Sequence, residues 1–163
     1  YLETKFGIFA EILYYDGQAE SVALVMGEVS DAEGVLCRIH SHCIGAHVFN
    51  SIECDCREQM AAAQSMIEQE GRGVIIWLDQ EGKGNGHLAL MQSIPFKVAG
   101  DPQAVSYEKA GFKADARDYH AAAGILGDLR VRSVKLLANG SGKVDELRRL
   151  SVTVEDVIQL SGN

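Results

Sequence analysis

The sequence contains no run of about 20 apolar residues, the length that a membrane-spanning helix needs, and no basic segment followed by an apolar one at its start. We therefore expect no membrane partner and no secretion signal, and we predict a cytoplasmic protein. The chain has only two prolines, and it contains no internal repeat, low-complexity tract or linker rich in proline and serine. Its 163 residues suffice for a full hydrophobic core, so we expect residues 1–163 to form a single domain.

Positive charge is also scarce. Lysine and arginine number 15 against 23 acidic residues, which gives a net charge of −8. A nucleic-acid binder usually needs a basic face to neutralise phosphates, so this balance argues against a nucleic-acid partner. A single nucleotide needs only a few well-placed cations and backbone N–H groups, and a local phosphate site therefore stays compatible with the composition.

Hydrophobic patterning predicts a regular alternation of strands and helices. Apolar, β-branched runs bounded by polar residues or glycine predict strands over Ser21–Met26, Val35–His40, Gly73–Leu78, Val131–Leu137 and Val152–Ile158. Helical periodicity predicts helices over Arg57–Glu70, Tyr119–Leu129 and Lys143–Leu150, the first of which ends at Gly71. Because strands and helices alternate after residue 35, we expect an α/β fold with a mostly parallel mixed sheet flanked by helices.

Polar segments follow two of the predicted strands directly. The strand Val35–His40 leads into Ser41, His42 and Cys43, and the strand Gly73–Leu78 leads into a glycine-rich loop over residues 79–86. Parallel sheets bind ligands at the carboxyl ends of their strands. We therefore expect both segments to lie at the same edge of the sheet and to form the functional site there.

Three of the four cysteines form a metal-like pattern. Cys43, Cys54 and Cys56 have the spacing Cys-x10-Cys-x-Cys, which lacks the Cys-x-x-Cys of redox proteins, and a disulfide between the last two would be strained. In a chain without a secretion signal, such cysteines are more naturally reduced thiols or metal ligands. Catalytic zinc sites use three protein ligands and leave the fourth position to water, whose pKa then falls to about 7. The pattern predicts a zinc site that serves chemistry.

Other residues can also complete this site. Cys37 lies inside the strand Val35–His40, where we interpret it as a small buried apolar residue, although it can act as a ligand. His40, His42 or His47 can instead provide the fourth ligand. Closure by a histidine would make the zinc structural and would weaken the enzyme interpretation.

Several motifs accompany the cysteines: Arg38-Ile-His-Ser-His-Cys43, Ser51-Ile-Glu-Cys-Asp-Cys56, Glu70-Gly-Arg-Gly73, Gln80-Glu-Gly-Lys-Gly84 and Gly111-Phe-Lys-Ala-Asp-Ala-Arg-Asp-Tyr119. Together they resemble GTP cyclohydrolase II, the first enzyme of riboflavin synthesis, over most of the chain. The resemblance implies a homodimer that opens the imidazole ring of GTP by hydrolysis and releases formate and pyrophosphate. It also implies zinc on the three cysteines and Mg²⁺ with the triphosphate.

The resemblance further implies roles for particular residues. The zinc ligands are Cys43, Cys54 and Cys56, and the substrate contacts are Arg38, His40, Ser41, His42, Gln59, Glu81, Gly82, Lys83 and Lys143. Arg38, Lys83 and Lys143 are the cations for the phosphates, while Glu81 or Gln59 can pair with the guanine edge.

Two catalytic residues are implied near the end of the fifth motif. Asp115 is the proton acceptor, and Arg117 is a proposed nucleophile towards the α-phosphate. Arginine is a poor nucleophile because its pKa exceeds about 12, so we expect Arg117 to stabilise phosphoryl transfer electrostatically. The simpler interpretation of the two residues is a surface ion pair.

Four positions of the expected site depart from the family pattern in charge. Glu53 and Asp79 replace arginines, Lys83 replaces a further arginine, and His42 replaces a glutamate. Lysine is a point charge that cannot make the bidentate contacts of arginine. We expect this loss of positive charge to weaken triphosphate binding.

Two further departures concern hydroxyl groups. Ile94 stands at the position of a tyrosine on the helix expected after the glycine-rich loop, and Gln103 stands at the position of a threonine. Loss of the tyrosine hydroxyl would impair the second hydrolysis and leave a formylated, ring-opened product. We therefore expect a divergent hydrolase of GTP or a related purine nucleotide, with an altered substrate or product. A non-catalytic zinc protein and a nucleotide-binding module without hydrolysis are the alternatives.

Overall fold

Seven strands form one mixed sheet in the computed structural model, which describes residues 1–140 and 142–160. The strands are β1 (Leu2–Thr4), β2 (Gly7–Tyr15), β3 (Glu20–Met26), β4 (Val35–Ser41), β5 (Gly73–Leu78), β6 (Val134–Leu137) and β7 (Val154–Ile158). Their order is β1-β2-β3-β5-β4-β6-β7. The pairs from β1 to β5 are antiparallel, whereas β5, β4, β6 and β7 run parallel to their neighbours. Ser141 and the end of the expected domain, residues 161–163, lie outside the described residues.

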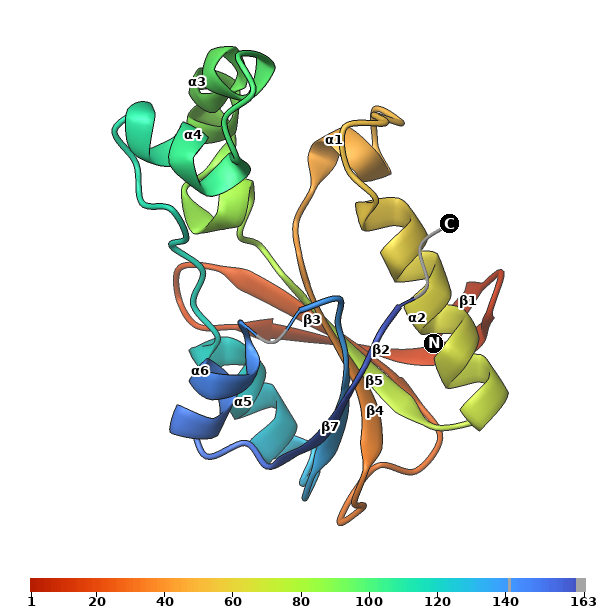
Figure 1. Ribbon diagram of the computed structural model, residues 1–163. Helices are drawn as coiled ribbons and strands as arrows, with labels where there is room; N and C mark the ends of the chain where they lie inside the picture. The colour runs from red at the N-terminus through yellow and green to blue at the C-terminus, as the bar shows by residue number, and fades with distance from the viewer. Residues whose placement is uncertain (141, 161–163) are drawn as a thin grey trace.

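The helices cover both faces of the sheet and extend beyond one of its edges (Figure 1). They are α1 (Ile44–His47), α2 (Cys56–Glu70), α3 (His87–Val98), α4 (Gln103–Lys109), α5 (His120–Asp128) and α6 (Val144–Arg149), with a short 3-10 helix η1 over Gly82–Gly84. Helix α2 lies on one face, α5 and α6 lie on the other, and α3 and α4 pack on each other beyond the end of β5. No helix within the described residues is long and apolar enough to cross a membrane.

Strand β5 illustrates why these residues form a central strand. Val74 and Ile76 face the larger apolar cluster, which includes Ile125 of α5, whereas Ile75 faces the smaller cluster with Ile67 of α2. A strand that is covered on both faces needs apolar residues at successive positions, and β5 has them. Helix α2 ends as expected at Gly71, whose φ of 72° is a left-handed conformation that glycine adopts without strain.

The expected α/β fold is confirmed, and each of the five predicted strands is present. The predicted strand Val131–Leu137 begins only at Val134, because residues 131–133 form a loop. The sequence interpretation missed β1 and β2, which extend the sheet by antiparallel pairing. It also expected a helix after the glycine-rich loop but did not predict where this helix begins and ends. Pro95 lies inside that helix, where proline removes a hydrogen-bond donor and obscures the helical pattern.

Candidate active site

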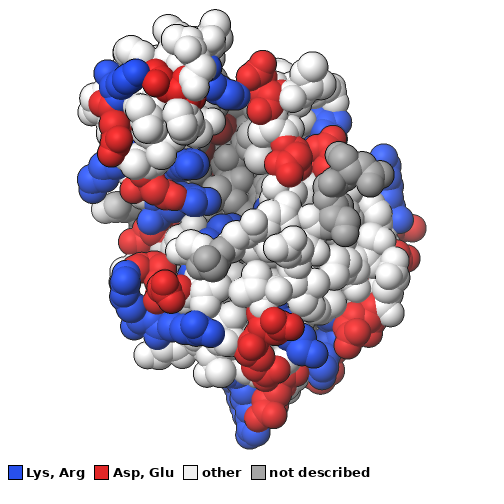
Figure 2. Space-filling view, in the orientation of Figure 1, with Lys and Arg blue, Asp and Glu red and all other residues white. Residues whose placement is uncertain are grey.

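The polar segments that follow β4 and β5 meet at one edge of the sheet, as predicted. The main-chain N–H of His42 donates to Leu78 O at 2.9 Å and joins the ends of the two strands. A cavity of about 800 Å³ opens at this edge. Figure 2 shows the hollow between the α3–α4 side of the molecule and the α1 side. Every residue predicted for the site lines the cavity except Asp115.

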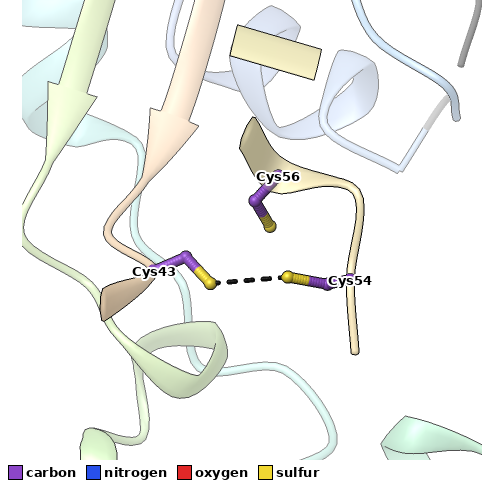
Figure 3. A group of neighbouring side chains, drawn as sticks. All are labelled: Cys43, Cys54 and Cys56. Carbon is purple, nitrogen blue, oxygen red and sulfur yellow. Dashed lines mark hydrogen bonds between the residues drawn. The ribbon is translucent and has the colours of Figure 1, made fainter. Parts of the chain in front are cut away.

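The three cysteines come together at one side of this cavity. Cys43 follows β4, Cys54 lies in the loop after α1, and Cys56 is the first residue of α2. Their sulfur atoms lie within 4.8 Å of one another and point towards a common centre (Figure 3), with Cys43 Sγ 3.6 Å from Cys54 Sγ. Two sulfur atoms bound to one tetrahedral zinc ion at about 2.3 Å lie roughly 3.8 Å apart, so the cluster fits zinc.

Without a cation, the Cys43 and Cys56 thiols of the cluster are protonated. Burial raises the pKa of Cys43, and burial together with the neighbouring thiols of Cys54 and Cys43 raises the pKa of Cys56. Thiols of this kind ionise when a metal ion takes up the negative charge, and metal binding then releases protons.

The alternative ligands lie elsewhere. Among the described residues, the cluster contains only the three cysteines. His40 Nε2 lies 2.9 Å from His47 Nε2, and His42 Nδ1 lies 3.2 Å from Asp79 Oδ1, so each histidine has another partner. Cys37 is fully buried in the core, where burial raises its pKa to about 12. The described part of the site therefore keeps the three-ligand form.

A second group, which we call the inner wall, consists of Arg38, His40, Gln59 and Lys143. Arg38 is 5% exposed and donates to Leu137 O at 3.0 Å and to Gln59 Oε1 at 2.6 Å, while its Nε has no partner in the described residues. Lys143 donates to Ile39 O at 2.8 Å. Neither cation has a carboxylate within 4.0 Å in the described chain. A buried cation without a counter-charge, such as Arg38, is costly, and an anionic ligand between the two cations would relieve this cost.

The pKa values of the inner wall reflect the same imbalance. Burial, followed by the charges of Arg38 and Arg117, lowers the pKa of Lys143 to about 7. Burial and the Arg38 charge likewise lower the pKa of His40 to about 3, so this imidazole is neutral at physiological pH. Its Nδ1 lies 3.4 Å from the Arg38 guanidinium, which is always a donor. His40 therefore carries its proton on Nε2 and donates it to His47.

The glycine-rich loop lies against the segment that contains Asp115 and Arg117. A Cβ added at Gly84 would lie 2.5 Å from Ala116 O, so only glycine allows this approach. The main-chain N–H of Ala116 donates to Lys83 O at 2.9 Å. The loop thereby places Arg117 at the cavity, where it is a lining residue.

Asp115 and Arg117 form an ion pair, with Arg117 Nε 2.9 Å from Asp115 Oδ1. Burial alone would raise the pKa of Asp115, but the hydrogen bonds from the Arg117 side chain and N–H outweigh it and hold the pKa below its usual range. A carboxylate of low pKa is a weak base, so the pair is better suited to orienting Arg117 than to removing a proton.

The residues that depart from the family pattern in charge pair at the opening of the cavity, which we call the rim. His42 is hydrogen-bonded to Asp79, as described above. Lys97 Nζ lies 2.9 Å from Glu53 Oε2. Asp79 does not line the cavity, and the Glu53 side chain is 73% exposed. The carboxylate of Glu53 thus forms an ion pair with Lys97, and the carboxylate of Asp79 is hydrogen-bonded to His42.

The sequence interpretation named Ile94 of α3 and Gln103 of α4, which line the cavity, but it missed other lining residues from these two helices. Leu90 and Ser93 come from α3, and Tyr107 from α4 is 1% exposed yet lines the cavity. Burial, followed by the Glu81 charge, raises the pKa of Tyr107 and keeps its hydroxyl protonated. The position of a tyrosine in a short helix does not reveal that it faces a distant cysteine loop.

Comparison with known proteins gives a family for this chain. The family model described as GTP cyclohydrolase II matches residues 1–159. The riboflavin biosynthesis proteins RibBA of Bacillus cytotoxicus and Bacillus mycoides are each 40% identical to the chain over 161 residues, or 98% of this chain and 41% of theirs. The chain therefore spans about two fifths of the length of these curated relatives.

A solved structure shares the fold. RibBX from A. baumannii, described as a two-domain 3,4-dihydroxy-2-butanone 4-phosphate synthase, superimposes with a TM-score of 0.50 at 20% sequence identity. The match covers 96% of this chain and 38% of that protein. At this identity the similarity concerns the fold alone.

Proposed function

The chain belongs to the GTP cyclohydrolase II family, and we propose that it opens the imidazole ring of a guanine nucleotide by zinc-dependent hydrolysis. The observation that carries the proposal is one cavity that joins three convergent thiols to two cations without a carboxylate partner in the described residues, the buried Arg38 and the half-buried Lys143. The thiols suit a metal ion, and the cations suit phosphates. We assign the reaction to riboflavin biosynthesis, for which the RibBA relatives are named.

The metal ligands in this proposal are Cys43, Cys54 and Cys56. A bound zinc ion supplies Lewis-acid chemistry, because it lowers the pKa of a water molecule to about 7. The cysteines would hold the metal at one side of the cavity. Within the described chain the cluster has no fourth protein ligand, so room remains for a water molecule and a purine.

The nucleotide contacts that we propose are Arg38, His40, Ser41, His42, Gln59, Gly82, Lys83 and Lys143. Arg38 and Lys143 attract the phosphates, and Mg²⁺ accompanies the triphosphate. Gln59 turns its oxygen to Arg38, which leaves its amide N–H groups to donate to the guanine carbonyl. Arg117 stabilises charge at the α-phosphate, and Asp115 orients it. As a proton acceptor, Asp115 would first have to release Arg117.

In this proposal, the identity of the product depends on the side chain at position 94. This side chain lines the cavity and offers no hydroxyl at the position where the family has a tyrosine. We expect hydrolysis to stop after ring opening, which would leave the formyl group on the product.

Incubation of the zinc-loaded protein with GTP and Mg²⁺, followed by mass spectrometry, tests the proposal. We expect a ring-opened product that keeps the formyl group, with the mass of GTP plus one water molecule if the triphosphate stays intact and of GMP plus one water molecule if pyrophosphate leaves. Cys43→Ser, with its fold checked by circular dichroism, should form none. Stoichiometric release of formate would contradict the formyl-retaining product but support ring opening. Unchanged GTP, with other purine nucleotides also unchanged, would contradict hydrolysis and favour a zinc- or nucleotide-binding paralogue.

We also propose a homodimer. Large apolar side chains on α3 are exposed to solvent, namely Leu88, Met91, Ile94 and Val98. Such a group usually marks an interaction surface. Light scattering after size exclusion should give a mass of twice 17.7 kDa, and a monomer at micromolar concentration would contradict the dimer.

A further inference from the structure

Glu81 lies in the glycine-rich loop, but its carboxylate binds the segment Cys43–Ile44, which we call the cysteine loop. Its Oε2 accepts the main-chain N–H of Ile44 at 2.8 Å, and its Oε1 accepts the N–H of Gly82 at 3.1 Å. Ile44 directly follows Cys43. The Glu81 side chain is only 11% exposed, so these two hydrogen bonds are largely shielded from water.

The main chain of Glu81 organises its own loop as well. Its carbonyl oxygen accepts hydrogen bonds from Gly84 N at 3.0 Å and Gly86 N at 2.9 Å. The same loop contacts Ala116, as described above. Glu81 therefore lies where the cysteine loop, the glycine-rich loop and the Asp115–Arg117 segment meet.

The carboxylate of Glu81 is anchored to the main chain by both of its oxygen atoms. Each oxygen accepts a hydrogen bond from a main-chain N–H, and such charge-assisted bonds are stronger than neutral ones. The nearest basic side chain within the described residues is His87, whose Nδ1 is 3.9 Å away and exposed. Each oxygen keeps a further lone pair, so the bond to Ile44 is compatible with a ligand contact at the same carboxylate.

We propose that Glu81 is a positioning residue that fixes Cys43 for metal binding through the Ile44 N–H. The inference rests on the proposed function in one respect, namely that the three cysteines hold a metal ion. Residues that orient metal ligands typically change metal affinity by about 10–100-fold when they are replaced.

Two variants weaken the same hydrogen bond from opposite ends. Glu81→Gln keeps the side-chain size but removes the negative charge and leaves one acceptor oxygen for the two main-chain N–H donors. Ile44→Pro removes the N–H donor and leaves Glu81 intact. Proline suits this position, because Ile44 is the first residue of α1 and Cys43 before it is extended, with φ of −147° and ψ of 90°. Ile44→Ala is the matched control, since it shortens the side chain but keeps the N–H.

Anaerobic titration of the reduced protein with Co²⁺ measures the effect, because thiolate-to-cobalt charge-transfer bands report both affinity and geometry. We expect Glu81→Gln and Ile44→Pro each to weaken Co²⁺ binding by about 10–100-fold, and Ile44→Ala to stay within about threefold of the parent protein. The effects of Glu81→Gln and Ile44→Pro should not add, because both variants remove one interaction. If either variant fails to fold, the other still tests the bond.

Unchanged Co²⁺ affinity in Glu81→Gln, combined with weaker GTP binding, would overturn the inference and make Glu81 a substrate contact. Additive losses in the double variant would also overturn it. Absence of Co²⁺ and Zn²⁺ binding in the parent protein would contradict the proposed function instead, so the two failures are distinguishable.

Discussion

The inner wall and the rim of the cavity carry charge in different ways. On the inner wall, Arg38 is buried and Lys143 is half-buried, and neither has a carboxylate partner within the described chain. On the rim, Asp79 and Glu53 are at least half exposed and pair with His42 and Lys97. Exposed ion pairs contribute at most about 1 kcal/mol, whereas buried unpaired charges dominate local energetics.

This difference bears on the expectation that the charge departures weaken triphosphate binding. The acidic departures lie on the rim, where Glu53 pairs with Lys97 and Asp79 is hydrogen-bonded to His42, and water screens their charge from the inner wall. Arg38 is the cation of the inner wall that water screens least. The balance of charge along the sequence is therefore a poor guide to phosphate affinity, and burial is a better one.

Replacement of Arg38 should have the largest effect on ligand binding. Arg38→Met removes a buried cation, and we expect GTP affinity to fall on the order of 100-fold, as for other desolvated charge contacts. Calorimetry with a non-hydrolysable GTP analogue measures the loss, and Arg38→Lys should recover part of it. A change of less than threefold in Arg38→Met would break the distinction between inner wall and rim.

His40 makes the inner wall sensitive to acid. Its pKa is about 3 in the folded protein, below the ordinary histidine value of 6.5, so the unfolded chain binds the proton more readily. The neutral imidazole therefore favours folding above pH 6.5, and this stability is lost as the pH falls from 6.5 towards 3. At pH 5 the loss should be about 2 kcal/mol. Urea unfolding of the metal-free protein at pH 7.5 and pH 5 measures it, and an equal pH dependence in His40→Asn would contradict this assignment.

Lys143 should give nucleotide binding a pH dependence. With a pKa of about 7, its ammonium group is present below pH 7, and above that pH anion binding must take up a proton. We expect GTP affinity to fall by up to about fivefold between pH 7 and pH 8. Lys143→Met should bind weakly and without this slope. Persistence of the same slope in the variant would assign it to another group.

Changes at the rim should have the smallest effects. Glu53→Gln breaks one exposed ion pair and Asp79→Asn weakens one exposed hydrogen bond with His42, and we expect GTP affinity to change by less than about threefold. The same binding assay that is used for Arg38→Met provides the comparison. A tenfold gain in affinity in either variant would show that rim charge reaches the phosphates.

Much of the fold follows from local patterns. The buried run in β5 and the glycine stop of α2 are encoded over a few neighbouring residues, and the structure confirms both. Strand β2 was missed because its exposed positions include Leu13 and Tyr15, so apolar residues occur on both of its faces without a clear alternation.

The site was less accessible to sequence reasoning. The three cysteines lie within 14 consecutive residues, so their metal-like spacing can be recognised in the sequence. Ligands bind at the carboxyl ends of parallel strands, and this rule predicted where in the fold the cysteines lie. The carboxylate bridge from Glu81 to Ile44 joins residues 37 positions apart, and the Lys97–Glu53 pair joins residues 44 apart. Such contacts depend on how loops pack in three dimensions, which local propensity does not specify.

The central claim is that the unpaired cations of the inner wall form an anion site for the nucleotide phosphates. Equilibrium binding of guanosine, GMP, GDP and GTP to the metal-free, reduced protein in the presence of Mg²⁺ tests it most directly. We predict that affinity rises from guanosine to GTP, by about tenfold or more for each phosphate that reaches a charged partner. Guanosine binding as tightly as GTP would contradict the account.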